Sequence, residues 1–503
     1  MELWRRRFLT IDPRSLAALR VGLALLLLLD LAKRASDLSV WYTNAGLLPN
    51  HRLLWRPDTP HQLSYLYALF TAPQVRVAFV ITALVYLCFL VGFRTRLMHV
   101  LSWFALLSLQ VRATMLENGG DYVLCGALLW SLFLPLGACG SLDRALARVR
   151  EPDSPEPQPV RSLAALALLL QLAVIYLFNA LNKTGVTWQD GSAVHYMLHQ
   201  SRIVTLLGLW VRDHAPQSLL RALSYATLVI EYALPLLIVS PWLRWPRTLA
   251  VGLIWSFHGS IALLANLGLF SPVMMVFSLV LLGPADWAWV DRRFGRRARL
   301  LRERLNPALV WLAAHTQAPP KRPPSAAVRG LRELTVGALM VLALSQVLIE
   351  NKAIPRWLRL PQPAFMTAAI SYLRLNQGWS MFAPNAPRDD VGIVVDAVTA
   401  DGRHIDPFNE RASVVADPSA RRLPDRLGQS WLYCDYVVRI ERTELLHDAL
   451  REWVLGHHRR THRAEDRVIS FKAYVLEQVS PRPFELAPSE LQVREFLRGK
   501  AQK

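Results

Sequence analysis

Residues 162–182 read SLAALALLLQLAVIYLFNALN, an apolar run interrupted only by single polar residues. An α-helix of about 20 apolar residues, rising 1.5 Å per residue, crosses the hydrocarbon layer of a bilayer. This run therefore predicts a transmembrane helix. Similar runs predict further spans near 15–33, 74–93, 97–116, 121–137, 217–240, 247–265, 268–283 and 331–349. The fold class that follows is an all-α polytopic membrane helix bundle of about nine spans, with a small C-terminal α+β soluble domain.

The composition supports a membrane protein. Of the 503 residues, 53% are hydrophobic and 19% are charged, whereas soluble domains carry about 25% charged residues. A net charge of +19 would indicate a nucleic-acid partner in a soluble protein, but here the basic residues gather in loops between apolar runs. We therefore predict a lipid bilayer as the partner and no nucleic acid. Only seven of the 57 basic residues are Lys, which favours an Arg-rich bacterial source.

The basic loops also predict the orientation of the chain. Arginines occur at 5–7, at 94 and 96, and at many positions of 288–329, whereas Arg112 stands alone between the third and fourth expected spans. The positive-inside rule then places the N-terminus inside, in a bacterial cytoplasmic (inner) membrane. Nine spans would place the C-terminal domain outside, and one miscounted span would move that domain to the other side.

We divide the chain into a transmembrane bundle (1–285), a basic inner loop with the final span (286–350), and an extracytoplasmic α+β domain (351–503). In the last part the pattern predicts a β-hairpin at 391–408, an amphipathic helix at 440–456 and a strand at 467–478. Residues 188–212 have helical apolar spacing. They predict a helix at the outer membrane face, or equally a short loop helix packed on the bundle.

Ionisable side chains inside apolar spans are costly, so they are candidates for function. We interpret Asp30 and Glu231 as members of internal hydrogen bonds or bundle-stabilising pairs. Lys183 could extend to the headgroups, or, when desolvated, lose its proton and act as a base, which Arg cannot do. His258 could be a neutral interior histidine or a catalytic one, and Asp121 could simply favour the start of its helix.

Four segments resemble a known family, the HTTM domain proteins, which are bacterial relatives of vitamin K-dependent gamma-glutamyl carboxylase. They are YTNAGLLP (42–49), GFRTRL (92–97) leading to ENGGDY (117–122), NKTGVTWQDG (182–191) and FHGSIALLANLGLFSPVMM (257–275). The resemblance extends to about residue 285 and rests on polar residues at matching offsets inside apolar spans. Where the animal enzymes carry a His in the segment matching ENGGDY, this chain has Asn-Gly-Gly-Asp, and its C-terminal region is shorter.

The resemblance implies a carboxylase of the carbon-carbon lyase and epoxidase type. Lys183 would deprotonate a hydroquinone of the reduced vitamin K or menaquinol type. Oxygen would then add to give a strong base that takes a proton from a protein or peptide Glu, to which CO2 adds. No metal is predicted. The candidate catalytic residues are Lys183, His258 and Asp121, which we expect to share one cavity; the candidate substrate-binding residues are Asn118, Trp188, Asp190 and Asn266.

A second hypothesis belongs to another class of function. The bundle could be a non-enzymatic scaffold or assembly factor that presents its C-terminal domain to a partner. The sequence carries no P-loop, no dinucleotide-binding glycine motif, no nucleophile elbow and no HExxH, so it offers no other enzyme class. A lipid-soluble quinone bound to the protein would distinguish the enzyme from the scaffold.

Overall fold

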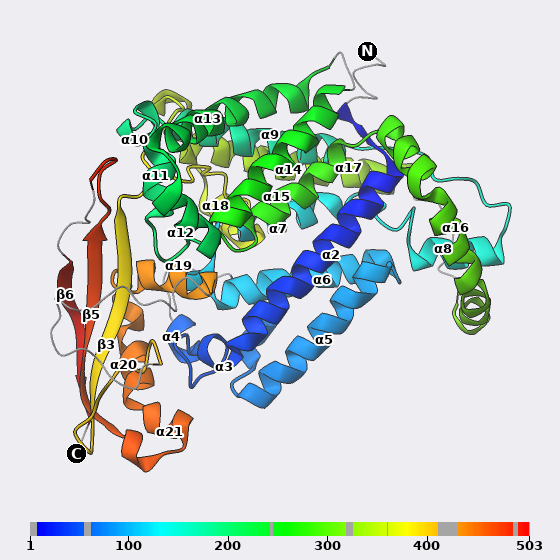
Figure 1. Cartoon of the computed structure of the whole chain (residues 1–503). Coiled ribbons are helices and arrows are strands. Elements are labelled where there is room, and N and C mark those ends of the chain that lie inside the picture. The colour runs from blue at the N-terminus through cyan, green and yellow to red at the C-terminus, as the bar shows by residue number, and fades with distance from the viewer. Residues whose placement is uncertain are drawn as a thin grey trace.

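A computed structural model describes residues 8–54, 62–241, 245–317, 325–359, 361–410, 430–485 and 491–501. The basic residues 5–7 lie outside the described residues. A helical region comes first along the chain, and a sheet with its own helices packs against one end of it (Figure 1).

Six described helices are long and apolar enough to cross a membrane. They are α2 (Pro13–Ser36), α5 (Ala72–Val91), α9 (Leu163–Asn182), α13 (Gln217–Val239), α14 (Trp245–Leu264) and α17 (Ala326–Glu350). A seventh candidate is bent by 104° and joins Phe270–Leu281, made of α15 (Phe270–Ser278) and η3 (Leu279–Leu281), to the first half of α16 (Pro284–His315). The chain is thus a multi-span helical membrane protein with six or seven candidate spans.

The other two expected spans, 97–116 and 121–137, are helices that fall short of the requirements for a span. α6 (Thr95–Arg112) carries Arg96, His99, Gln110 and Arg112, which lower the mean hydropathy of its sequence. α7 (Gly119–Ser131) has 13 residues, or about 20 Å, whereas the hydrocarbon core is about 30 Å thick. Most of α7 is buried among other helices. Its apolar sequence is explained by burial in protein, which the length of an apolar run does not distinguish from burial in lipid.

The helix starts follow from local capping. Ser162 precedes α9, and its hydroxyl accepts a hydrogen bond from the backbone N–H of Ala164. Asn118 and Asp121 form a capping box at the start of α7. Such caps satisfy N–H groups that have no partner inside the helix. They fix where each helix begins, and so which of its side chains face the bundle interior.

The secondary structure of two segments, 188–212 and 288–329, differs from the prediction. Residues 188–212 are three short helices, α10 (Val186–Gln189), α11 (Ala193–Leu198) and α12 (Leu206–His214), in place of one. The chain turns between the first two at Gly191, which has a φ of +75°. The expected basic loop at 288–329 is largely helical, because α16 extends to His315. Residues 318–324 lie outside the described part.

The C-terminal region contains a four-stranded antiparallel sheet in the order β4-β3-β5-β6. Its strands are β3 (Asp389–Thr399), β4 (His404–Ile405), β5 (Val468–Val479) and β6 (Gln492–Lys500). The predicted hairpin and the predicted strand at 467–478 are confirmed. The helix expected at 440–456 is wrong in its bounds, because α19 (Trp431–Ile440), η7 (Glu444–Leu446) and α20 (His447–Leu455) occupy that region. Both helices lie between the sheet and the bundle (Figure 1).

The C-terminal region is joined to the bundle through α19. The hydroxyl of Tyr433 donates to the carboxylate of Asp37 at 3.4 Å, and Arg439 donates to the backbone carbonyl of Thr114 at 3.1 Å. Trp41 packs its ring against Tyr433 at 4.9 Å between ring centroids. The hydrophobic core is therefore continuous from the membrane helices into the sheet.

Candidate functional site

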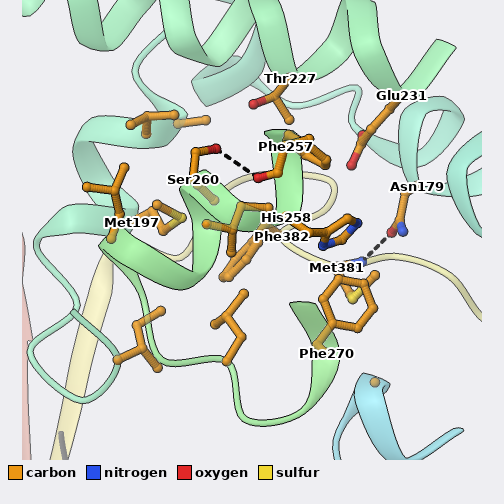
Figure 2. A pocket seen from close by; sticks show the side chains of 18 of the residues that line it. Asn179, Met197, Thr227, Glu231, Phe257, His258, Ser260, Phe270, Met381 and Phe382 are labelled. Atoms are coloured by element: carbon orange, nitrogen blue, oxygen red, sulfur yellow. Dashed lines mark hydrogen bonds between the residues drawn. The ribbon is translucent and has the colours of Figure 1, made fainter. Parts of the chain in front are cut away.

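A cavity of about 650 Å³ lies between α9, α13 and α14. Its lining is mostly apolar, with a few polar side chains that converge on it (Figure 2). The segment Met381–Ala386 and the helix α19 come from the C-terminal half of the chain and complete its wall. The cavity is therefore a joint product of the membrane bundle and the C-terminal region.

Lys183 and Glu231 form a buried ion pair on the wall of this cavity. The Nζ of Lys183 lies 2.6 Å from both carboxylate oxygens of Glu231, and the two side chains are 3% and 6% exposed. The ammonium also lies 4.9 Å from the centroid of the Trp188 ring, whose N–H donates to the carbonyl of Phe382 at 2.7 Å. Lys183 terminates α9, so its side chain is placed by the end of that helix.

His258 lies on α14 and is buried beside Tyr176 of α9. The Nε2 of His258 is 2.9 Å from the hydroxyl of Tyr176. The rings of Phe257 and Phe270 pack against the imidazole at 5.1 Å and 5.4 Å between centroids. Its Nδ1 is buried with no hydrogen-bond partner in the part of the chain that the structure describes. His258 as a residue contributes to the cavity lining.

A second polar group faces the cavity from α19. Asp435 forms a hydrogen bond with the side chain of Asn118, and Arg439 lies 3.6 Å away on the same helix. Burial raises the pKa of Asp435 to about 7. The neighbouring Cys434 hydrogen-bonds to the backbone carbonyl of Arg202, and burial raises the pKa of its thiol to about 12. Asp435 can therefore exchange a proton near neutral pH, whereas Cys434 stays a thiol.

Five of the seven residues predicted from the sequence line this cavity. They are Lys183, His258, Asn118, Trp188 and Asn266. Asn266 also fixes the chain locally, since its backbone N–H donates to Ile203 and its side chain accepts from the N–H of Gly268. The structure brings together these residues; their catalytic and binding roles remain predictions.

Asp121 and Asp190 are outside the cavity lining. Asp121 accepts from Arg34 at 3.1 Å, and Arg34 in turn pairs with Asp30 at 2.8 Å. The expectation that Asp121 shares a cavity with Lys183 is therefore wrong, because a buried guanidinium on α2 engages its carboxylate. Asp190 accepts from the N–H and the hydroxyl of Ser192, which is the geometry of a local turn.

The sequence-based reasoning missed several cavity residues. Glu231 was expected to form a stabilising pair, and it does so, but its partner is the candidate base. Tyr176 and Asn179 precede Lys183 by seven and four positions, so all three lie on one face of α9. That spacing was a usable signal. Asp435 lies some 250 residues further along the chain, and no local pattern pointed to it.

Among the described residues, no group of three or more His, Cys, Asp or Glu side chains has an arrangement that could hold a metal ion. The polar groups at the cavity are instead suited to hydrogen bonding and proton transfer with an organic ligand. An amine, a carboxylate, an imidazole and a phenol all meet there within an apolar wall.

One family model covers the part of the chain that contributes most of these residues. The HTTM domain matches residues 8–287, which include α9, α13, α14 and the residues Lys183, Glu231 and His258. Searches of the curated proteins and of the solved structures found no match. Because the match covers more than half of its length, the chain belongs to the HTTM domain family. The HTTM domain is the domain found in vitamin K-dependent gamma-carboxylase-like proteins.

Proposed function

We propose that the protein is a membrane enzyme that resembles the vitamin K-dependent gamma-carboxylase. It would act on a lipid-soluble hydroquinone of the reduced vitamin K or menaquinol type, with O2 and CO2 as co-substrates. The cavity beside the Lys183–Glu231 pair is the observation that carries the proposal. Its volume of about 650 Å³ is within the range of small-molecule sites, and its apolar wall with few polar groups fits a ring with two hydroxyls.

The ion pair supplies a means to make the amine a base. In water an ammonium and a carboxylate both stay charged, but in a water-poor cavity the neutral pair becomes competitive, because two charges no longer have to be desolvated. A proton passed from Lys183 to Glu231 leaves a neutral amine on the cavity wall. That amine can accept a proton from a hydroxyl of the ligand. A hydroquinone bound there would supply the reaction with O2.

A lipid-soluble ligand also needs a route to the cavity. Ala226 on α13 and Ser256 and Ser260 on α14 line the cavity and are exposed. α13 and α14 are both candidate spans, with 28% and 22% of their apolar windows buried in protein. We therefore propose that the side of the cavity between them faces the hydrocarbon layer, from which the ligand enters.

The variant Lys183→Arg tests the base. Guanidinium stays protonated at any accessible pH, so the variant should lose quinone-dependent CO2 fixation and hydroquinone epoxidation in membranes. Lys472→Arg is a matched control, because Lys472 also faces a carboxylate, that of Glu495 at 3.9 Å, but on the protein surface. A fully active Lys183→Arg protein would end the base hypothesis. Inactivity of the wild type in both assays would favour the scaffold function.

We further propose that the N-terminus is inside and the C-terminal region outside. Arg14 pairs with Asp291 at one end of the bundle, whereas Tyr433 bonds to Asp37 at the other end of α2. The C-terminal region thus packs at the end of the bundle opposite to the start of α2.

An impermeant thiol reagent on intact cells tests this orientation. Cys434 is a poor reporter because it is 9% exposed. A cysteine placed at the exposed Ala464 should be labelled, and one at the exposed Ala308 of α16 should be labelled only after permeabilisation. The reverse labelling pattern would show that the proposed orientation is wrong.

A further inference from the structure

The helix α16 has an unusual position for a 32-residue helix. It is about 48 Å long at 1.5 Å per residue, and a bend of 104° turns its first half away from α15. Its start is tied to α2 by the ion pair of Arg14 with Asp291 at 2.8 Å. Its end is tied to α8 (Leu142–Arg150), because Arg150 donates to the carbonyl of Ala313 at 3.0 Å. Figure 1 shows α16 and α8 together at the edge of the molecule.

One side of α16 is apolar and only partly covered by protein. Trp287, Val290, Phe294, Leu305 and Leu312 follow the spacing of three and four residues that defines one helix face. Phe294 and Leu305 are 47% and 49% exposed. Two further large side chains, Trp289 and Trp311, are 61% and 62% exposed, and at 100° per residue they lie among the arginines rather than on this face. In water this much apolar surface would be unfavourable.

The other side of α16 is strongly basic. Its seven arginines are all exposed, and none forms an ion pair or a hydrogen bond within the part of the chain that the structure describes: Arg292, Arg293, Arg296, Arg297, Arg299, Arg302 and Arg304. Of the three acidic residues on the helix, Asp291 faces Arg14, and Asp286 accepts from Thr248 and from the N–H of Gly283. The positive charge of this surface is therefore largely uncompensated.

We propose that α16 is a binding surface for anionic phospholipid headgroups. The helix would lie in the membrane surface at the N-terminal end of the bundle. Its apolar side chains would enter the boundary of the acyl chains, and its guanidinium groups would bind lipid phosphates. A soluble polyanion such as RNA would match the charge but would leave Trp289, Phe294 and Trp311 in water. The combination of both faces favours a lipid surface.

Native mass spectrometry of the full-length protein in mild detergent tests this surface. The protein is titrated with phosphatidylglycerol and, separately, with phosphatidylcholine of the same acyl chains. We expect tighter binding of phosphatidylglycerol. In the triple variant Arg293→Gln/Arg297→Gln/Arg304→Gln the preference should fall by about fivefold for each basic residue removed, while phosphatidylcholine binding is unchanged.

Two matched variants separate charge from folding. Arg293→Lys/Arg297→Lys/Arg304→Lys keeps the charge and should keep the preference. The second variant removes the same amount of charge from the C-terminal region by glutamine substitution of three exposed arginines, Arg442, Arg459 and Arg463. It should leave the preference for phosphatidylglycerol unchanged. The proposal is overturned if the wild type shows no preference, if the triple glutamine variant matches it, or if a short RNA displaces the lipid and binds α16 in its place.

Discussion

Glu231→Gln removes the carboxylate that faces the candidate base. Both oxygens of Glu231 lie 2.6 Å from the Nζ of Lys183, and both side chains are almost fully buried. The variant would leave an ammonium in the cavity with only the Trp188 ring and a neutral amide beside it. Removing one partner of a buried ion pair costs about 3–5 kcal/mol, because the other charge stays desolvated and uncompensated.

We expect Glu231→Gln and Lys183→Met each to lower the free energy of unfolding by this amount. The double variant Lys183→Met/Glu231→Gln should recover most of the loss, since neither charge remains. The assay is equilibrium unfolding of detergent-solubilised protein, supported by the fraction that stays monodisperse after heating.

The exposed pair of Lys472 and Glu495 provides the control. Its nitrogen and oxygen are 3.9 Å apart, and the side chains are 57% and 25% exposed. Glu495→Gln should therefore change the free energy of unfolding by no more than about 1 kcal/mol. If the two single variants at the cavity were as stable as the wild type, the buried ion pair would not exist as described.

Two further predictions concern Asp435 and the helix contacts. The raised pKa of Asp435 means that the folded protein keeps a proton that the unfolded chain releases; stability should fall as the pH rises from about 4 to 7. Asp435→Asn should reduce that fall in thermal scans, and an identical pH profile would contradict it. Gly120→Ala should lower the free energy of unfolding by about 1–3 kcal/mol, because the added Cβ would lie 2.6 Å from the backbone N of Phe270. The loss should appear as a lower melting temperature. Gly252→Ala, which meets nothing within 4 Å, should be neutral or slightly stabilising, and equal effects of the two would refute the contact.

The sequence predicted most spans because length and hydropathy are local properties. α2, α5, α9, α13, α14 and α17 all coincide with the expected apolar runs. α6 and α7 were overcounted as full spans because a helix buried in protein is as apolar as one that faces lipid. The helix α16 was expected to be a loop, because its arginines obscured the apolar spacing from Trp287 to Leu312.

The candidate site was predictable where a single residue carried the signal. Lys183 and His258 stood out because ionisable groups are rare in apolar spans. The partner of Lys183 was not predictable, because Glu231 reaches it only through the packing of α13 on α9. The separation of Asp121 from the cavity was not predictable for the same reason, since its carboxylate faces Arg34 of α2. The wall contributed by α19 depends on how the C-terminal region folds back onto the bundle.

The most direct test of the proposed function is the mass of the lipid that co-purifies with the protein. A quinone or hydroquinone should be extracted from monodisperse wild-type protein. The variant Ala226→Trp, which puts a large ring into the side of the cavity, should lose it. Ala222→Trp, one turn earlier on the exposed surface of α13 and outside the cavity lining, should retain it. A well-folded wild-type preparation that contains no quinone, or equal amounts in both tryptophan variants, would contradict the proposal that this cavity binds the substrate.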